Sequence, residues 1–299
     1  MPPPSDLGLA GRAPYEVSAR ARACWDSFIG CAQAADLDRT SRVPGRTGRQ
    51  VCIPLGGWPD RRPLARILAA ARSGETSQRF RPDSEATKLI RDHGDATTED
   101  VFAALAVARD GILAFLDSPE AATLGTMPTV SPVGPLPVLT IVSGMNFELA
   151  VAALDLAPCG APPPPDHLLL SALAALADVT AGLAARKKLT VRVSVQSPKG
   201  GWAFATADGR WVTTELPPGP VQGCAVLGEL PVLVDVAASR TWAAPALATG
   251  KLRVQEVGTL LALVSKIESS PGVPAIGAVQ AAARALSGAA GFVFRLWHR

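Results

Sequence analysis

Two carboxylates, Glu148 and Asp155, lie inside an otherwise apolar run at residues 137–156. At 3.6 residues per turn, Glu148, Ala152 and Asp155 share one side of a helix. A carboxylate that faces a core is costly unless it is paired, protonated or bound to a metal. A Glu followed by a His four residues later places two metal ligands on one helical face. Here the fourth residue is Ala152, so the sequence predicts a site on this helix without its usual second ligand.

The first half of the chain reads as helices joined by loops. An apolar stripe at three- and four-residue steps predicts a helix from residue 14 to about 35. Thr47 is placed to cap a second helix, and residues 59–73 read as helical again. Thr97 and Asp100 resemble a capping box that opens an amphipathic helix, which Ser118-Pro119 ends. Residues 121–136 read as a loop before the helix at 137–156. This pattern predicts a four-helix bundle.

A change of period follows the APPPP segment at 161–165, which is the strongest boundary signal in the chain. After a helix from 166 to about 186, residues 189–197 alternate as a strand, and Asp208-Gly209 predicts a hairpin turn. Two further strands and two helices complete an α+β fold with a small sheet. We therefore expect five parts, which are a flexible N-terminus at 1–13, a bundle at 14–160, a linker and connecting helix at 161–188, a small α+β domain at 189–272 and an apolar helix at 273–299.

Composition excludes several classes of protein. A net charge of +3 without long runs of Lys or Arg argues against nucleic-acid binding. The five cysteines are scattered and never spaced as CxxC, which predicts a reducing cytoplasm rather than a disulfide framework or a structural zinc site. The N-terminus lacks the features of a signal peptide, and we expect no transmembrane span.

Two passages resemble a known family. PGRTGRQVCIPLGGW at 44–58 and FELAVAALDL at 147–156 are similar to conserved segments of the DinB-like, mycothiol-dependent maleylpyruvate isomerase family of actinobacteria. The resemblance covers roughly residues 15 to 265 and implies a metal-binding four-helix bundle joined to a smaller α+β domain.

The resemblance also implies positions for the site residues. The family's metal is held by a His of the first segment and by a Glu and a His of the second, which correspond here to Pro54, Glu148 and Ala152. Two of the three ligands are therefore replaced. Asp155 stands where the family also has an acid, and Arg240 stands where the family places an arginine of its second domain. One carboxylate does not make a zinc site.

None of the three histidines is placed to substitute for the missing ligands. His93 reads as part of an exposed loop, His167 as the start of a helix and His298 as the exposed C-terminus. Cys52, two residues before Pro54, is better explained as a core residue, because a helix would point it away from that position.

Two hypotheses remain open. In the first, the chain is a metal-free relative of the family that binds a small molecule or a protein partner, with Glu148, Asp155 and Arg240 as candidate ligand-binding residues. In the second, it is a mycothiol-dependent transferase or isomerase with a metal-free or rebuilt site. We expect no cofactor other than mycothiol under the second hypothesis, and no zinc. The C-terminal helix is expected to pack on the chain's own second domain or on a second copy of the chain, and peripheral contact with a membrane or a partner is the alternative.

Overall fold

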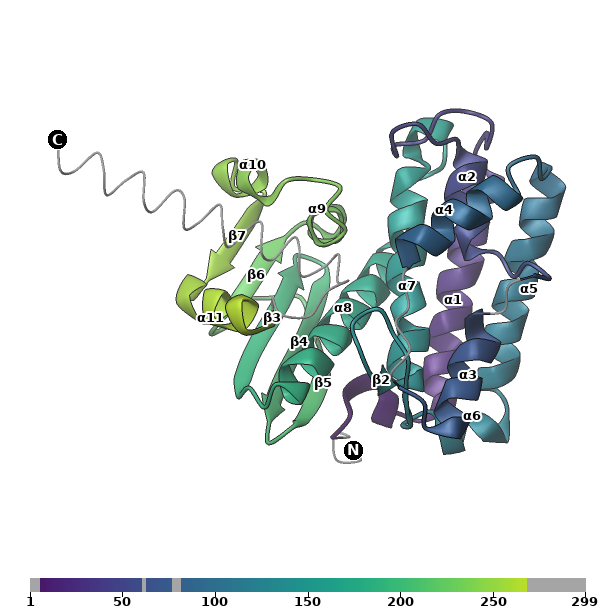
Figure 1. The fold of residues 1–299 in the computed structure, drawn as a ribbon. Helices are drawn as coiled ribbons and strands as arrows, with labels where there is room; N and C mark the ends of the chain where they lie inside the picture. Colours follow the sequence, from purple (N-terminus) through teal and green to yellow (C-terminus); the bar gives the residue numbers. More distant parts are fainter. Residues whose placement is uncertain (1–5, 61–62, 77–81, 268–299) are drawn as a thin grey trace.

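The computed structural model describes residues 6–60, 63–76 and 82–267. The predicted C-terminal helix at 273–299 and His298 lie outside these residues. The described chain has two parts that stand side by side (Figure 1), a helical N-terminal region and a region built around a five-stranded sheet. The α+β class predicted from the sequence is therefore confirmed.

Four long helices make up the helical region. They are α1 (Pro14–Gln33), α5 (Thr98–Leu116), α7 (Val138–Asp155) and α8 (Asp166–Arg186). α7 packs against α1 and α8, and α1 packs against α5. The predicted stripe of α1 is buried, including the fully enclosed Trp25 and Phe28. The predicted capping box at Thr97 and Asp100 is present at the start of α5.

Short elements join the long helices. They are η1 (Gly8–Gly11), α2 (Gly48–Cys52), η2 (Ile53–Leu55), α3 (Pro63–Ser73), α4 (Pro82–Asp92), α6 (Pro119–Leu124), η3 (Ala157–Cys159) and the paired strands β1 (Pro128–Thr129) and β2 (Leu136–Pro137). Thr47 caps α2 through a capping box with Gln50, but Pro54 restricts the helix to a single 3-10 turn beyond Cys52. Of the helix predicted over 59–73, residues 59–60 form a turn instead, and α3 covers Pro63–Ser73. Part of the loop predicted over 121–136 is instead α6, β1 and β2.

The sheet has the strand order β5-β4-β3-β6-β7. Its strands are β3 (Val191–Ser197), β4 (Gly200–Ala207), β5 (Arg210–Leu216), β6 (Ala225–Gly228) and β7 (Leu252–Gln255), accompanied by α9 (Leu230–Ala237), α10 (Ala243–Ala248) and α11 (Val257–Ile267). β3 pairs with β6 in parallel, while the other neighbours are antiparallel. Asp208 and Gly209 both have positive φ, at 52° and 79°, as a tight hairpin turn requires.

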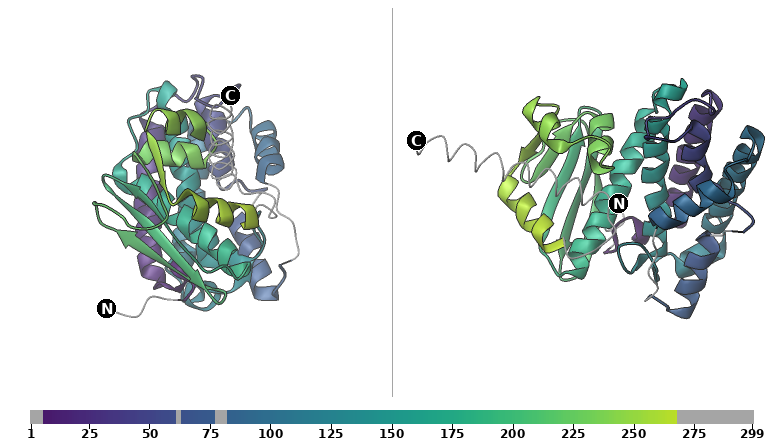
Figure 2. Two further views of the ribbon diagram at one scale, coloured as in Figure 1. Left: turned by 90° about the vertical axis from the view of Figure 1, so that its left-hand side faces the viewer. Right: turned by 45° about the horizontal axis from the view of Figure 1, so that its top comes forward.

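α8 joins the two regions because it packs against α7 on one side and against β4 and β5 on the other (Figures 1 and 2). Both α7 and α8 are apolar and long enough to cross a membrane, but 72% and 78% of their apolar windows are buried inside the fold, as in the core helices of a soluble protein. Small residues dominate the buried face of α8, and they let the sheet and α7 approach its backbone closely.

Residues 6–12 differ from the loose N-terminus that their proline and glycine content predicts. Leu9 and Ala10 of η1 are buried, at 3% and 2% exposure. Leu7 forms a β-bridge with Trp211 of β5, whose backbone N–H donates to the carbonyl of Asp6 at 3.0 Å. The N-terminal segment thus lies along the sheet and belongs to the packed structure.

A fully buried carboxylate, Asp178 of α8, lies where η1, α7 and β5 meet. Its Oδ1 accepts hydrogen bonds from the Leu9 N–H at 2.9 Å, the Trp211 Nε1–H at 2.9 Å and the Thr213 hydroxyl at 2.7 Å. Its Oδ2 accepts from the Thr140 hydroxyl at 2.8 Å. Burial raises the pKa of Asp178, although these four donors oppose that shift.

We predict that Asp178→Ala destabilises the protein by roughly 3 kcal/mol, because it leaves buried donors without an acceptor. Asp178→Asn keeps one acceptor oxygen and removes the charge. Since the folded-state pKa of Asp178 is raised, the folded protein binds the proton more tightly than the unfolded chain does, and stability contributed by this group falls as the pH rises from about 4 through the folded pKa.

Urea unfolding between pH 4 and pH 8 measures this pH dependence. In Asp178→Asn, the part of the unfolding free energy that falls with rising pH should be lost. Asp208→Asn, at an exposed turn, should show the same dependence of unfolding free energy on pH as the wild type. If the unfolding free energies of the wild type and Asp178→Asn change with pH in parallel, the pKa of Asp178 is the same in the folded and unfolded states, which would contradict the prediction.

Candidate functional site

Glu148 of α7, predicted from the sequence to face the core, is exposed rather than buried. Ile141, Gly144 and Met145 lie on the same side of α7 and are only partly buried, so this stripe is less covered than the rest of the helix. The prediction of a costly carboxylate in the core is therefore wrong for Glu148. Nearly all other positions of α7 are buried. Because the whole helix is apolar in composition, the sequence does not indicate which side is less covered.

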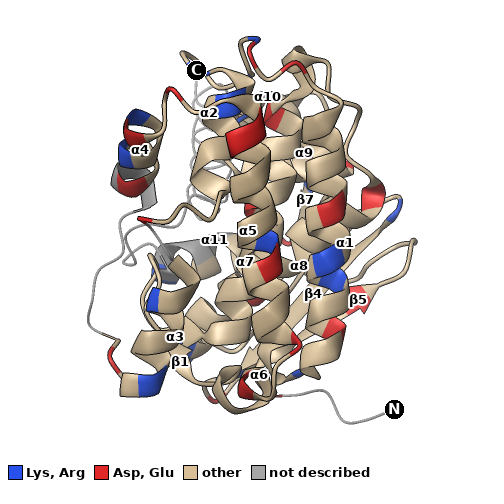
Figure 3. Ribbon diagram, turned by 90° about the vertical axis from the view of Figure 1, so that its right-hand side faces the viewer, with Lys and Arg blue, Asp and Glu red and all other residues tan. Residues whose placement is uncertain are grey.

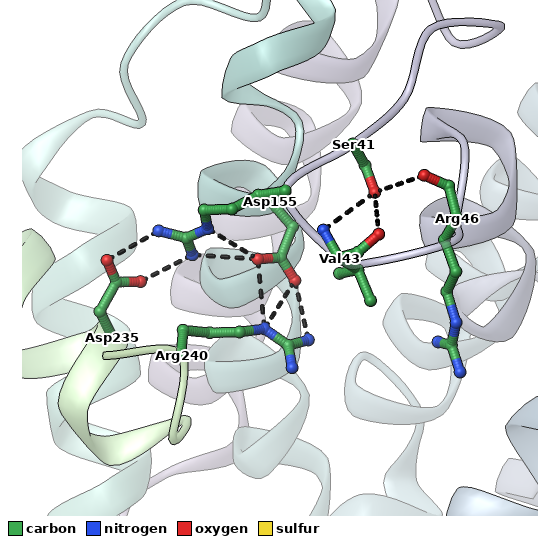
Figure 4. A network of polar contacts seen from close by, with 7 residues as sticks. Ser41, Val43, Arg46, Asp155, Asp235 and Arg240 are labelled. Carbon is green, nitrogen blue, oxygen red and sulfur yellow. Dashed lines mark hydrogen bonds and ion pairs between the residues drawn. The ribbon is translucent and has the colours of Figure 1, made fainter. Parts of the chain in front are cut away.

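Asp155, one turn further along α7 than Ala152, is the buried acid of this helix at 1% exposure. Arg240, which follows α9, donates two hydrogen bonds to Asp155 Oδ2, from Nε at 3.0 Å and from Nη2 at 2.8 Å. Figure 4 shows these hydrogen bonds, which connect the end of α7 to the sheet region. The structure thus brings together two of the three candidate ligand-binding residues, and it pairs Arg240 with Asp155 instead of Glu148.

A second arginine, Arg42, completes a neutral cluster of four charges. Its Nε donates to Asp155 Oδ1 at 3.0 Å, while Nη1 and Nη2 each donate to the Asp235 carboxylate of α9 at 2.7 Å. Burial by itself lowers the pKa of Arg42, but the hydrogen bonds and charges of Asp235 and Asp155 outweigh it and raise the pKa above its usual value. Arg42 therefore stays charged and links α7 to α9.

The loop between α1 and α2 is shaped to hold Arg42 in place. The Arg42 backbone N–H donates to the Asp155 carbonyl at 2.9 Å. Next to it, the Ser41 N–H and hydroxyl both donate to the Arg46 carbonyl at 2.9 Å, which closes the loop (Figure 4). On the other side, the Arg240 backbone N–H donates to the Asp235 carbonyl at 2.8 Å. Both arginines are thus fixed by backbone as well as side-chain contacts.

The residues at the positions implied for a metal do not suit one. Pro54 lies in η2 and has no donor atom in its side chain, and Ala152 is a buried methyl group at 6% exposure. In the described part of the chain, no group of three His, Cys, Asp or Glu is arranged to hold a metal ion. Cys52 is fully buried and its pKa is raised to about 12 by burial, with Cys159 adding to the effect, so it stays a neutral thiol.

The two histidines of the described chain make their contacts outside this cluster. His93 stacks on Trp58 with ring centroids 4.0 Å apart and contacts Asp60, so it is half-buried rather than freely exposed. His167 is exposed near the start of α8, as predicted, and its Nε2 lies 2.8 Å from the Ser27 hydroxyl.

Sequence reasoning missed Asp178, Arg42 and Asp235. Asp178 could have been found, because it interrupts an apolar helix as Glu148 does and the same test applies to it. Arg42 lies in a loop and Asp235 in a short helix, where charged residues are ordinary, and neither carries a local signal.

Comparison with known proteins gives a structural similarity only. The solved structures similar to this chain include the crystal structure of the mycothiol-dependent maleylpyruvate isomerase and that of a mutant of it in which a histidine is replaced by alanine. The identities are 17% and 16%, the TM-score is 0.48 for both, and each alignment covers 78% of this chain and 92% of the other. No family model matches the sequence, and neither does any curated protein. At these identities the comparison concerns the fold alone, and it assigns no site residue.

We predict a strong energetic coupling between Asp155 and Arg240. A double-mutant cycle with Asp155→Asn and Arg240→Gln should give a coupling free energy above about 1 kcal/mol, since one partner is buried and the contact is bidentate. The matched control is the pair Arg22 and Asp117, which lies at a similar 3.1 Å but is half exposed on both sides. Its coupling should stay below about 0.5 kcal/mol. Equal couplings for the two pairs in urea unfolding would contradict a special role for the Asp155 cluster.

Proposed function

We propose that this chain is a small-molecule-binding protein of the maleylpyruvate isomerase-like type that works without a catalytic metal. The observation that carries the proposal is the donor set on α7 and η2. Pro54 and Ala152 provide no ligand atoms where the family resemblance implies histidines, and the nearby acid Asp155 is already neutralised by Arg42 and Arg240. Catalytic zinc generally needs three protein ligands.

Arg240 is the residue of the cluster best placed to contact a ligand. Its side chain is 37% exposed, and its Nη1 makes no hydrogen bond to the described residues. Trp242, two residues later, is 80% exposed and adds an aromatic surface. A guanidinium with free N–H donors suits a carboxylate or phosphate group of a small molecule. Asp155 would then position Arg240, and Glu148 would line the less covered stripe of α7.

The surface charge supports a small ligand rather than a polyanion. In Figure 3, Lys and Arg segments are interspersed with Asp and Glu segments over the helical face, and neither sign forms a continuous patch. We further infer a reducing compartment such as the cytoplasm, because all five cysteines are buried and free. Contact with a membrane, a protein partner or a second copy of the chain remains a prediction from the sequence.

Metal analysis and activity measurements test this proposal. Protein purified without chelators should carry no stoichiometric zinc, and it should not isomerise maleylpyruvate in the presence of mycothiol. Turnover without zinc would favour a mycothiol-dependent enzyme with a rebuilt site, and stoichiometric tightly held zinc would overturn the metal-free assignment.

We predict that Pro54→His combined with Ala152→His creates zinc affinity, because two imidazoles and the Glu148 carboxylate would then supply three ligands. Glu148 and residue 152 are four apart on α7, and α2, which leads into η2, packs against α7. Zinc binding is measured by isothermal titration.

The control is the triple variant with Glu148→Gln, which should bind zinc more weakly than the double variant. A folded double variant with wild-type zinc affinity would show that Pro54, Glu148 and Ala152 do not converge.

A further inference from the structure

One side of α8 points away from η1 and is incompletely covered. Asp178 accepts a hydrogen bond from the Leu9 N–H at 2.9 Å, so its side chain marks the side of α8 that faces η1. Successive residues of a helix are about 100° apart, and Leu176 and Thr180, each two positions from Asp178, therefore lie on the opposite side. Both are only partly buried, although most of α8 is buried.

The corresponding side of α7 is also incompletely covered. Ser143 lines a small hollow together with residues of η1 and α1, so it marks the side of α7 that faces these two helices. Ile141 and Met145, each two positions from Ser143, lie on the opposite side and are partly buried. Between them is Gly144, and no described atom beyond its own stretch of helix stands within 4 Å of the position that its Cβ would take.

These partly buried residues lie at the same level of two neighbouring helices. α7 packs against α8, and the Thr140 hydroxyl donates to Asp178 at 2.8 Å, which places residues 141 and 176 within about one turn of each other along the pair. Burying their remaining apolar surface would contribute roughly 25 cal/mol per Å². We call this surface the α7–α8 face, and it consists of Ile141, Met145, Leu176 and Thr180.

The chain contains a segment long enough to reach this face. The described residues end at Ile267, the last residue of α11, and α11 packs against α8. Residues 268–299 follow it, and the sequence predicts an apolar helix over 273–299. Such a helix would be about 40 Å long, whereas α7, with 18 residues, is about 27 Å long. A segment that starts beside α8 can therefore lie along the α7–α8 face.

The composition of this segment suits the face. Ile276, Val279 and Leu286 recur at helical spacing and give the segment an apolar side. The segment carries three arginines and one glutamate, whereas Glu148, the exposed charge on the same side of α7, is an acid. Both the apolar surface and the sign of the charge are thus complementary.

We infer that residues 273–299 dock on the α7–α8 face of their own chain, with their apolar side against Ile141, Met145 and Leu176. Covalent connection through α11 keeps the segment beside α8 at a high effective concentration, which favours this contact over the same contact between two chains. The inference does not rest on the function proposed for Arg240.

Photo-cross-linking of the full chain tests this contact. Met145→Cys is labelled with a maleimide-benzophenone, and the five native cysteines are buried. An equal mixture of ¹⁵N-labelled and unlabelled protein is irradiated, and cross-linked peptides are identified by mass spectrometry. Cross-links from position 145 to residues 273–299 should join peptides of the same isotopic composition. Cross-links between labelled and unlabelled peptides would assign the face to a second copy of the chain, and the absence of any cross-link to 273–299 would also overturn the proposal.

Two matched variants show whether the apolar side of the segment makes the contact. In the Met145→Cys chain, Val279→Asp combined with Leu286→Asp should lower the cross-linked fraction about fivefold or more, because it places charge against an apolar surface. Ala281→Asp, about half a turn from Val279, should leave the cross-linked fraction unchanged. Equal cross-linking in all three chains would contradict the proposed contact.

Three further measurements complete the test. Val107→Cys on α5, where the side chain is 60% exposed, should give no cross-link to 273–299. Thr180→Cys provides the same test from α8 if Met145→Cys does not fold. A full chain that sediments with phosphatidylglycerol vesicles and shows no cross-link within the chain in solution would assign the segment to a membrane surface and overturn the proposal.

Discussion

The packing of the sheet against the helices depends on one buried carboxylate. Asp178 collects donors from η1, α7 and β5 on its two oxygens, and it belongs to the helix that both regions share. Apolar surfaces alone could slide over one another with little change in free energy, whereas hydrogen bonds in a dry interior fix both distance and direction. Asp178 therefore sets the register in which β5 and the N-terminal segment lie on α8.

Asp178 and Asp155, the two acids buried in the described part of the chain, are stabilised in different ways. Asp178 is surrounded by neutral donors, and its pKa is raised by burial. Asp155 instead faces two guanidinium groups, and Asp235 balances the remaining charge. The first arrangement lies inside the seam between α8 and the sheet, and the second lies at the C-terminal end of α7. Together they hold the sheet region at two separate points, so the helices and the sheet act as one packed unit.

Much of the fold could be predicted because its signals are local. The stripe of α1, the capping boxes at Thr47 and Thr97 and the Asp208-Gly209 turn depend only on neighbouring residues, and all are present. The exposure of Glu148 could not be predicted, since it depends on which side of α7 the rest of the fold covers less. The pairing of Arg42 with Asp235 is similar, because the two residues are 193 positions apart and only the tertiary fold brings them together. The rule that an acid within an apolar helix is buried and compensated fails for Glu148 but holds for Asp178.

The position of the N-terminal segment along β5 has a consequence for synthesis on the ribosome. Asp6 and Arg210 are 204 residues apart in the sequence and adjacent in the fold. η1 therefore emerges long before β5 exists, and the buried side of Leu9 has no sheet to pack on until most of the chain has been made. Contacts of such long range carry a large loop-closure cost and form late. The helices can assemble during translation, but docking of the N-terminal segment must wait until the hairpin of β4 and β5 has been released.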